Sequence, residues 1–457
     1  MIAERVLGEP GTIDERTLIE FVEARRWFGA KTMEVTHATL IDGAVLRTEP
    51  PPLLATALTE IRFQPGTHDM YQLLFGFRPR DDGWGEQVIA QLDGWIAYDA
   101  LTDPQLSREL VHLMRSGANV QASEGILEFR SVGMDAFGPD LSEPRLLTGE
   151  QSNTSVVFGE ELILKVYRRL EAGINPELEM LRFLTERGFP NIAALAGWYA
   201  YSGRPLDATL GLLQAFVPGA EDGWELALEL LRSDSEGFLG RLRRLGEVTG
   251  SLHSVLGSSP GDPDFCPEDP SQEALALVVA TVDEEIEEMF LDLPDDETVA
   301  PIAGRGEEVR ERLRLISHVG PVGKVIRTHG DYHLGQALWA NDDWVILDFE
   351  GEPARSIAER RRKRSPLRDV AGMLRSFAYA ASASEIVHGV RAPEGWEERG
   401  RAEFLDGYFS TVDRSLIPPA QDAVDKLLAV FELEKAVYEL RYELNNRPDW
   451  VRIPVAG

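Results

Sequence analysis

Apolar runs separated by turn-forming residues characterise the first 135 residues of the chain. The runs cover residues 36–46, 55–64, 69–77 and 86–92, and Gly, Pro and Asp stand between them. Short β-favourable runs bounded by such residues are typical of strands joined by tight turns. The pattern therefore predicts a small β-rich module at the N-terminus.

The pattern changes from about residue 145. Residues 152–170 form two β-favourable runs around Gly159, which predicts a hairpin with Lys165 near the end of its second strand. A helix is expected after Asn175, because Asn can cap a helix whose first turn contains Pro176. Residues 208–220 are an apolar run broken by proline and glycine, as expected of a buried strand that turns into a connector.

Beyond residue 222 the apolar residues recur mainly at helical spacing. Residues 223–233, 238–256, 272–293 and 307–319 all show this period, and residues 431–446 read as a C-terminal helix. The chain is therefore predicted to be an α+β protein in three parts. These parts are residues 1–135 (rich in strands), 136–218 (a hairpin, a helix and a buried strand) and 219–457 (mainly helical).

Charge narrows the range of partners. The 457 residues carry 46 Lys and Arg against 77 Asp and Glu, a formal charge of −31, which opposes binding to nucleic acid and anionic membranes. The same charge opposes a nucleotide triphosphate unless a site supplies its own cations. No signal-peptide pattern or membrane-length apolar run is present, and Cys266 is the single cysteine. We therefore expect a cytoplasmic protein without disulfides.

The segment HGDYHLGQ at residues 329–336, followed by LDFE at 347–350, carries the strongest chemical signal. Asp331 stands five residues before Gln336, the spacing at which kinases place a catalytic Asp and a metal-binding amide. Asp348 follows an apolar strand, as the second metal-binding acid of kinases does. We predict Asp331 as the base, with Gln336 and Asp348 as Mg²⁺ ligands. The competing interpretation is a chance hairpin in which Asp and His cap turns.

Two histidines flank Asp331, and a zinc site is the alternative that these three side chains suggest. His329, Asp331 and His333 at alternate positions fit neither one helical face nor the usual structural zinc patterns. The glycines in the same segment indicate a loop. Each histidine is therefore predicted to form hydrogen bonds that fix this loop.

Lys165 lies in an apolar strand, where an unpaired ammonium would be costly to bury. Glu177 and Glu179 in the following helix are its candidate partners, as in the kinase pair that positions nucleotide phosphates. The segment QSNTS at residues 151–155 offers hydroxyl and backbone N–H groups to the phosphates. A basic run at residues 358–369 is interpreted as a charge-satisfied loop rather than a nucleic-acid patch.

Several long segments together resemble the bacterial maltokinase family. They are residues 150–159, 162–184, 329–336, 346–355, 365–377 and 442–450. The resemblance implies a two-lobed protein-kinase-like fold, similar to aminoglycoside and choline kinases. Residues 1–135 would then form an N-terminal cap and the start of the N-lobe, residues 136–218 the ATP-binding N-lobe, and residues 219–457 the helical C-lobe with the catalytic and acceptor sites. The resemblance also implies transfer of the ATP γ-phosphoryl to the anomeric hydroxyl of maltose, on the route from trehalose to α-glucan, with trehalose synthase as a possible partner.

The resemblance also implies roles for individual residues. ATP contacts are expected from Gln151, Ser152, Asn153, Thr154, Ser155, Lys165, Gln214, Phe216 and Val217, together with Glu179 as a candidate partner of the lysine. On the C-terminal helix, Tyr438 and Tyr442 share one face, and Glu439 and Glu443 are predicted to form an adjacent open acidic stripe. Rings next to carboxylates suit a sugar. The acceptor is therefore expected to contact Asp331, His333, Glu350, Tyr438, Glu439, Tyr442, Glu443 and Arg447.

Two alternatives remain open from the sequence. A related group with the same architecture phosphorylates glucosamine, so fold and motif do not decide the acceptor. The other alternative is a non-catalytic regulatory subunit with a kinase fold. The intact set of Lys165, Asp331, Gln336 and Asp348 argues against this second alternative.

Overall fold

The computed structural model describes residues 2–9, 11–64, 66–133, 141, 143–147, 152–316, 322–353 and 355–456. The chain divides into two compact units. The first unit comprises Met1–Thr185 and Ala193–Pro218, and the second comprises Glu186–Ile192 and Gly219–Gly457. Among the described residues, no helix is both long enough and apolar enough to cross a membrane.

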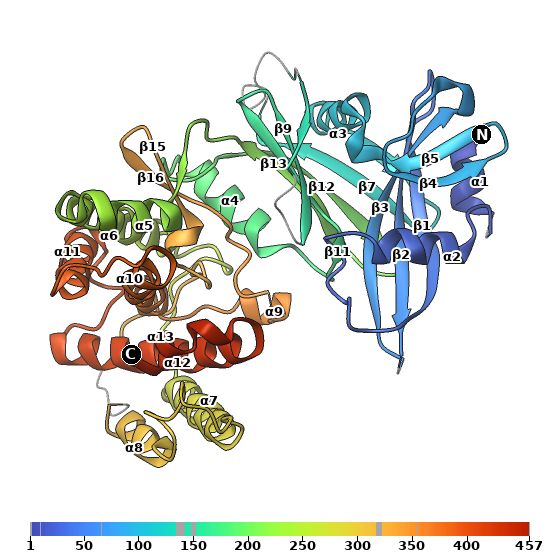
Figure 1. Cartoon of the computed structure of the whole chain (residues 1–457). Coiled ribbons are helices and arrows are strands. Elements are labelled where there is room, and N and C mark those ends of the chain that lie inside the picture. The colour runs from blue at the N-terminus through green and yellow to red at the C-terminus, as the bar shows by residue number, and fades with distance from the viewer. Residues whose placement is uncertain are drawn as a thin grey trace. The chain divides into compact units, whose positions relative to one another are not determined.

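The first unit begins with a six-stranded sheet (Figure 1). Its main path is antiparallel, in the order β1-β2-β3-β5-β4: β1 Val35–Arg47, β2 Leu53–Phe63, β3 His68–Pro79, β5 Trp95–Asp99 and β4 Val88–Leu92. The four predicted strands are confirmed, and β5 is an addition. Helices α1 (Ile2–Gly8) and α2 (Glu15–Glu23) share an apolar core with this sheet, in which Trp27 and Phe28 are buried against Tyr71.

A second, seven-stranded sheet completes the first unit. Its order is β6 Asn119–Gln121, β7 Gly125–Ser131, β12 Leu195–Gly203, β13 Ala208–Ala215, β10 Leu162–Tyr167, β9 Asn153–Phe158 and β8 Arg145–Leu146, with helices α3 (Pro104–Ser116) and α4 (Pro176–Glu186). The predicted hairpin is β9–β10, and Gly159 turns it with a φ of 55°. The predicted cap of α4 is present, because Asn175 Oδ1 accepts a hydrogen bond of 2.8 Å from the Glu177 amide.

One buried arginine joins the two sheets. The short strand β11 (Arg169–Leu170) pairs with β3, and Arg168 stands just before it. The Arg168 guanidinium is 1% exposed, donates to both oxygens of Asp99 on β5 at 2.8 and 3.0 Å, and reaches Thr154 Oγ1 on β9 at 2.8 Å. It also lies over the Trp27 ring, 5.2 Å from its centre. The two sheets are therefore connected through buried charge as well as apolar packing.

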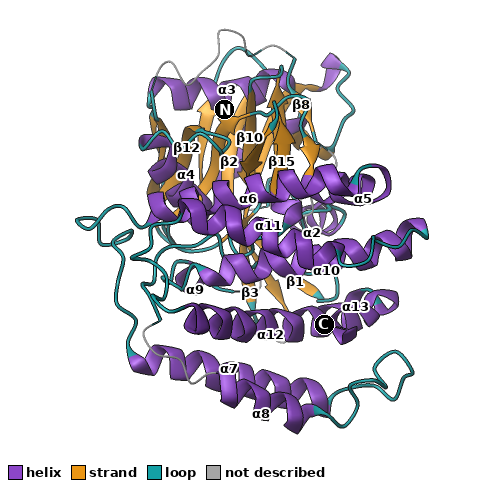
Figure 2. Cartoon of the chain, turned by 90° about the vertical axis from the view of Figure 1, so that its left-hand side faces the viewer, coloured by secondary structure: helices purple, strands orange, loops and turns teal. Residues whose placement is uncertain are grey.

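The second unit is mainly helical, as predicted. Its helices are α5 Gly223–Ser233, α6 Ser235–Leu256, α7 Gln272–Leu291, α8 Gly306–Ile316, α9 Ile357–Arg360, α10 Leu367–His388, α11 Trp396–Thr411, α12 Gln421–Asn446 and α13 Arg452–Ala456. Helices α6 and α11 cross closely, because a Cβ at Gly246 or Gly407 would collide with a carbonyl of the other helix. Helix α12 lies between α10 and the α7–α8 pair (Figures 1 and 2).

A small three-stranded sheet interrupts the helices. It consists of β14 (Glu221–Asp222), β15 (Ala337–Ala340) and β16 (Asp343–Ile346). The predicted Asn-Asp-Asp turn between β15 and β16 is confirmed, with positive φ at Asn341 and Asp342. The segments that precede β15 and follow β16 carry the predicted catalytic residues.

Candidate active site

The loop at residues 329–336 is held in place by Asp369, a buried residue of α10. Asp369 accepts hydrogen bonds from the backbone amides of His329 at 2.7 Å and Gly330 at 3.0 Å, and it contacts His253 Nε2 on α6 at 3.1 Å. Burial acts to raise the pKa of Asp369, but His253 and the loop outweigh it, so the pKa lies below the ordinary value. The ionised carboxylate thus fixes the start of the loop.

Both histidines of the loop form the predicted hydrogen bonds. His329 Nε2 donates to the Leu347 carbonyl at 2.8 Å, which connects the loop to the segment after β16. His333 Nδ1 accepts from the Gly335 amide at 3.1 Å and caps a short 3₁₀ helix, η4 (Leu334–Gln336). One histidine therefore connects the loop to the segment after β16, and the other stabilises the turn at the end of the loop.

Asp331 lies against a lysine from a distant part of the chain. Lys435 Nζ on α12 is 3.0 Å from Asp331 Oδ1 and 3.8 Å from Glu352 Oε1. Burial acts to raise the pKa of Asp331, but the charges of Lys435 and His333 outweigh it and hold the pKa below its usual range. Burial acts to lower the pKa of Lys435, whereas Asp331 and Glu352 raise it overall. The pair is therefore an ammonium facing a carboxylate.

Gln336 and Asp348 meet beside this loop. Gln336 Nε2 donates to Asp348 Oδ2 at 3.2 Å, and Asp348 has a φ of 58°, which is uncommon for a residue other than glycine. A half-turn of the Gln336 amide would present its oxygen in place of its nitrogen. A carboxylate and an amide oxygen are hard donors of the kind that Mg²⁺ accepts, so these two residues fit a magnesium site.

In the first unit, Lys165 on β10 pairs with Glu177 on α4. The distance from Lys165 Nζ to Glu177 Oε2 is 2.8 Å, and the Tyr167 hydroxyl donates to the same oxygen at 2.8 Å. Of the two candidate glutamates, Glu177 therefore forms the ion pair, and Glu179 is buried in the same helical turn. The pair holds the lysine at the register position opposite Ser155 on β9.

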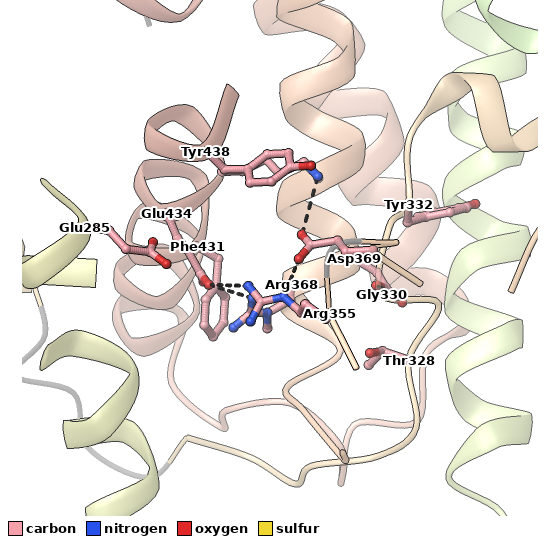
Figure 3. A pocket seen from close by; sticks show the side chains of 13 residues that line it. Glu285, Thr328, Gly330, Tyr332, Arg355, Arg368, Asp369, Phe431, Glu434 and Tyr438 are labelled. Atoms are coloured by element: carbon pink, nitrogen blue, oxygen red, sulfur yellow. Dashed lines mark hydrogen bonds and ion pairs between the residues drawn. The ribbon is translucent and has the colours of Figure 1, made fainter. Parts of the chain in front are cut away.

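A pocket opens beside the loop at residues 329–336 in the second unit (Figure 3). It encloses about 570 Å³, including the part open to solvent. Its lining comes from the loop, from α10, from α12, from α7 and from the segment after Asp348: Thr328, Gly330, Tyr332, Arg368, Asp369, Gly372, Phe431, Glu434, Lys435, Tyr438, Glu285, Glu352 and Arg355. Lys435 lines the pocket and contacts Asp331, so a molecule bound there would lie next to the predicted base.

Residues 143–405 match the phosphotransferase enzyme family. The chain belongs to this family. A second match covers residues 21–103 and is to the maltokinase N-terminal cap domain. The chain is therefore an ATP-dependent phosphotransferase that acts on a hydroxyl group, a sugar kinase that carries a cap of the maltokinase type.

This phosphotransferase is similar to two curated glucosamine kinases. One, from Streptacidiphilus jiangxiensis, is 26% identical over 324 residues, which are 67% of this chain and 70% of the relative. The other, from Mycolicibacterium smegmatis, is 25% identical over 329 residues, 68% of this chain and 78% of the relative.

Solved structures confirm the predicted two-lobed kinase-like fold. A glucosamine kinase in complex with glucosamine, ADP and inorganic phosphate matches with a TM-score of 0.70 at 19% identity, over 96% of this chain and 97% of that one. A second crystal form of glucosamine kinase matches with a TM-score of 0.69 at 20% identity, covering 96% and 97% of the two chains. At these identities the likeness concerns the fold.

The predicted acceptor residues of the phosphotransferase occupy different environments. Tyr438 lines the pocket, whereas Tyr442 is 44% exposed and does not line it. Glu439 and Glu443 do not form an open acidic stripe, because Glu439 pairs with Arg375 at 2.8 Å and Glu443 with Arg447 at 2.6 Å.

The structure also places the other residues predicted to contact the acceptor or ATP. His333 is 4.0 Å from Asp331, and Glu350 accepts a hydrogen bond from Arg360 through its backbone carbonyl. Of the predicted ATP contacts, Ser152, Asn153, Thr154 and Ser155 lie in or beside β9, and Gln214 lies on β13 with Phe216 and Val217 just after it. Gln151 is outside the described residues.

Sequence reasoning missed Lys435 and Asp369 as parts of this site. Lys435 is separated from Asp331 by 104 positions, and Asp369 is separated from His329 by 40. A signal for Lys435 existed, because it precedes Tyr438 by three positions and so shares its helix face. Asp369 offered no comparable local signal, since its role depends on packing between α6, α10 and the loop.

Proposed function

We propose that this phosphotransferase is a maltokinase, which transfers the γ-phosphoryl of ATP to the anomeric hydroxyl of maltose and releases maltose 1-phosphate and ADP. The observation that carries the proposal is the match of residues 21–103 to the maltokinase N-terminal cap domain. The pocket beside Asp331 supplies a place for the acceptor.

In this proposal Asp331 aligns the attacking hydroxyl and accepts its proton. As the sugar oxygen forms its bond to the γ-phosphorus, the bond to the β-phosphate oxygen breaks and the proton passes to an Asp331 oxygen. The lowered pKa keeps Asp331 ionised at neutral pH and ready to accept. Lys435 orients the carboxylate by holding one of its oxygens.

Gln336 and Asp348 would hold Mg²⁺, which neutralises charge on the phosphate oxygens when it is bound. Lys165, fixed by Glu177, supplies a cation for the phosphates in a chain of net charge −31. These roles follow from the chemistry of the donor groups and their partners within each unit.

The pocket suits a neutral sugar because most of its charges already have partners. Glu434 pairs with Arg368 at 2.6 Å (Figure 3), and Glu352 pairs with Arg355. Paired carboxylates and guanidinium groups keep spare lone pairs and N–H groups for sugar hydroxyls. The Tyr438 ring offers a flat surface to the C–H face of a sugar.

A glucosamine kinase is the second candidate, and one residue favours it. Glu285 on α7 lines the pocket and, among the described residues, has no group of opposite charge within ion-pair distance. Burial and the nearby Glu434 raise its pKa, although Arg441 and Arg355 oppose this. The ammonium of an amino sugar would compensate this carboxylate, whereas maltose would not. The two similar curated proteins are named glucosamine kinases.

Phosphorus NMR of a competition reaction decides between the two acceptors. The enzyme is incubated with ATP, Mg²⁺ and equal maltose and glucosamine. Phosphate on the anomeric oxygen of the disaccharide is expected, and phosphate on the 6-hydroxyl of the amino sugar would contradict the proposal. Glu285→Gln discriminates further, because it should lower turnover of an amino sugar much more than turnover of maltose.

We also propose that the product enters α-glucan synthesis in the cytoplasm and that the enzyme works beside trehalose synthase as a source of maltose. Support for this comes from the cap match alone. Copurification of the two proteins from cells at native levels tests it, and their separation under mild conditions would contradict a stable association.

A further inference from the structure

A second hollow adjoins the acceptor pocket and is lined by arginines. It encloses about 310 Å³, including the part open to solvent, and its charged lining consists of Arg355, Arg360, Arg364, Arg368, Glu352 and Glu359. Three of the four arginines belong to the basic run at residues 358–369. Four cations thus face two carboxylates in a protein whose net charge is −31.

Most charges of this hollow are compensated. Glu352 pairs with Arg355, and Arg368 pairs with Glu434 from the neighbouring pocket at 2.6 Å. Glu359 accepts from the Ser356 amide at 3.1 Å and from its hydroxyl at 2.8 Å, as the partner in a helix capping box. Arg360 donates to the Arg355 and Glu350 carbonyls at 3.0 and 3.1 Å.

Arg364 is the exception. Within the part of the chain that the structure describes, its guanidinium has neither a hydrogen-bond acceptor nor a carboxylate within ion-pair distance. Burial, together with repulsion from Arg368 and Arg355, lowers its pKa to about 10, and the attraction of Glu434 and Glu352 does not offset this. The prediction that the basic run is charge-satisfied therefore holds for its neighbours Arg361, which faces Asp264, and Lys363, which faces Glu268, but not for Arg364.

We propose that this hollow, which we call the Arg364 site, binds a phosphate group, either inorganic phosphate or the phosphate of a sugar phosphate. A planar guanidinium with free N–H groups forms paired hydrogen bonds with phosphate oxygens, and further guanidinium groups around it add charge. A bound dianion would compensate Arg364 at the cost of no existing ion pair.

The place of the Arg364 site gives it a consequence for activity. Thr328, Gly330, Glu352, Arg355 and Arg368 line both this hollow and the acceptor pocket. A sugar whose phosphate occupies the Arg364 site would extend into the acceptor pocket, where Lys435 contacts the base. Sugar phosphates therefore inhibit the enzyme in competition with the sugar acceptor and not with ATP.

Calorimetric titration of the full-length protein tests the site without catalysis. The probes are inorganic phosphate, glucose 1-phosphate and neutral glucose, all without nucleotide or Mg²⁺. Arg364→Gln removes the charge, Arg364→Lys retains it without the planar donor set, and Arg362→Gln is the matched control, because Arg362 is an exposed arginine of the same run. The variants should fold, because the hydrogen bond from the Arg364 amide to the Ile326 carbonyl does not depend on the side chain, and circular dichroism checks this.

We expect wild-type protein and Arg362→Gln to bind glucose 1-phosphate alike, Arg364→Lys to bind more weakly, and Arg364→Gln to bind at least about tenfold more weakly, as for loss of a charge-assisted hydrogen bond. Saturable binding of inorganic phosphate with similar affinity would identify a free-anion site. Binding of the sugar phosphate alone would identify a phosphosugar site.

Three results would overturn the proposal: no saturable binding by wild-type protein, equal binding by Arg364→Gln, or an equal loss of neutral glucose binding in that variant. The last result would make the hollow a sugar subsite. A second experiment measures how glucose 1-phosphate inhibits the initial rate at different concentrations of the acceptor that the enzyme uses, whether maltose or glucosamine. Failure of the maltokinase proposal therefore leaves the binding result intact.

Discussion

Lys435 places its ammonium nitrogen 3.0 Å from an oxygen of Asp331, although the two residues are 104 positions apart in the chain. The lysine is on α12, whereas the aspartate is in the loop that α10 holds. The charge state and orientation of the proposed base therefore depend on a helix near the C-terminus.

Replacement of this lysine should change the pH dependence of the reaction. Asp331 must be ionised to accept a proton, so activity falls as the pH drops through its pKa, which lies below the ordinary value in the wild type. In Lys435→Met the effect of burial is no longer opposed by the ammonium. The pKa then rises, and the acidic limb of the kcat/KM profile moves to higher pH.

The same variant should lose about 10- to 100-fold in kcat through misplacement of the carboxylate. Lys426→Met is the control, because Lys426 lies on the same helix and pairs with Asp422 near the surface. An unshifted acidic limb in Lys435→Met would show that Lys435 does not govern the ionisation of Asp331.

Asp331→Asn should retain the fold and nucleotide binding but lose about 10²- to 10⁴-fold in kcat, since the amide cannot accept the proton. Single-turnover kinetics and fluorescence titration with ADP measure the two properties separately. Turnover within a few-fold of the wild type would exclude Asp331 as the base.

The proposed magnesium ligands should differ in their response to substitution. Asp348→Asn removes a charged ligand and should abolish turnover at millimolar Mg²⁺, whereas Gln336→Asn keeps an amide oxygen and should mainly raise the Mg²⁺ concentration needed for half-maximal rate. Mg²⁺ titrations of the initial rate compare them. Identical metal dependence in the wild type and both variants would place the metal elsewhere.

Lys165→Met should raise the KM for ATP about tenfold or more and lower kcat, because the phosphates lose a cation. Glu177→Gln should do the same more mildly, since the lysine keeps its charge but loses the partner 2.8 Å away. Arg169→Gln, which removes an exposed pair with Asp69 on the same unit, is the control. An unchanged KM for ATP and kcat in Lys165→Met would show that Lys165 does not contact the phosphates.

Structural features that depend on residues close together in the sequence were predictable from it. Asn175 caps α4, Gly159 turns the β9–β10 hairpin, and Asn341 and Asp342 turn β15 into β16, because each conformation depends on residues within a few positions. The spacing of Asp331, Gln336 and Asp348 was readable for the same reason. Local backbone preference and short-range hydrogen bonding were sufficient for these elements.

The contacts that fix the loop and set the charge state of Asp331 were not predictable in this way. Asp369 and Lys435 reach the loop only after α10 and α12 have packed, and no short pattern records that packing. The sequence predicts Glu439 as part of an open stripe because its partner Arg375, 64 positions away, leaves no local signal. Arg364 is the reverse case: its interpretation as a paired charge fails because, among the described residues, the carboxylates that line the same hollow do not come within ion-pair distance of it.

The contact between Arg168 and Asp99 bears on whether the cap can be separated from the rest of the first unit. Asp99 lies on β5, within the segment that matches the maltokinase cap, and Arg168 stands between two strands of different sheets. If the cap were removed, a buried guanidinium would lose its carboxylate, at a cost of about 3–5 kcal/mol, and β3 would no longer cover β11. We therefore expect the cap to unfold together with the rest of the first unit in one cooperative transition rather than as a separable module, despite its own family match.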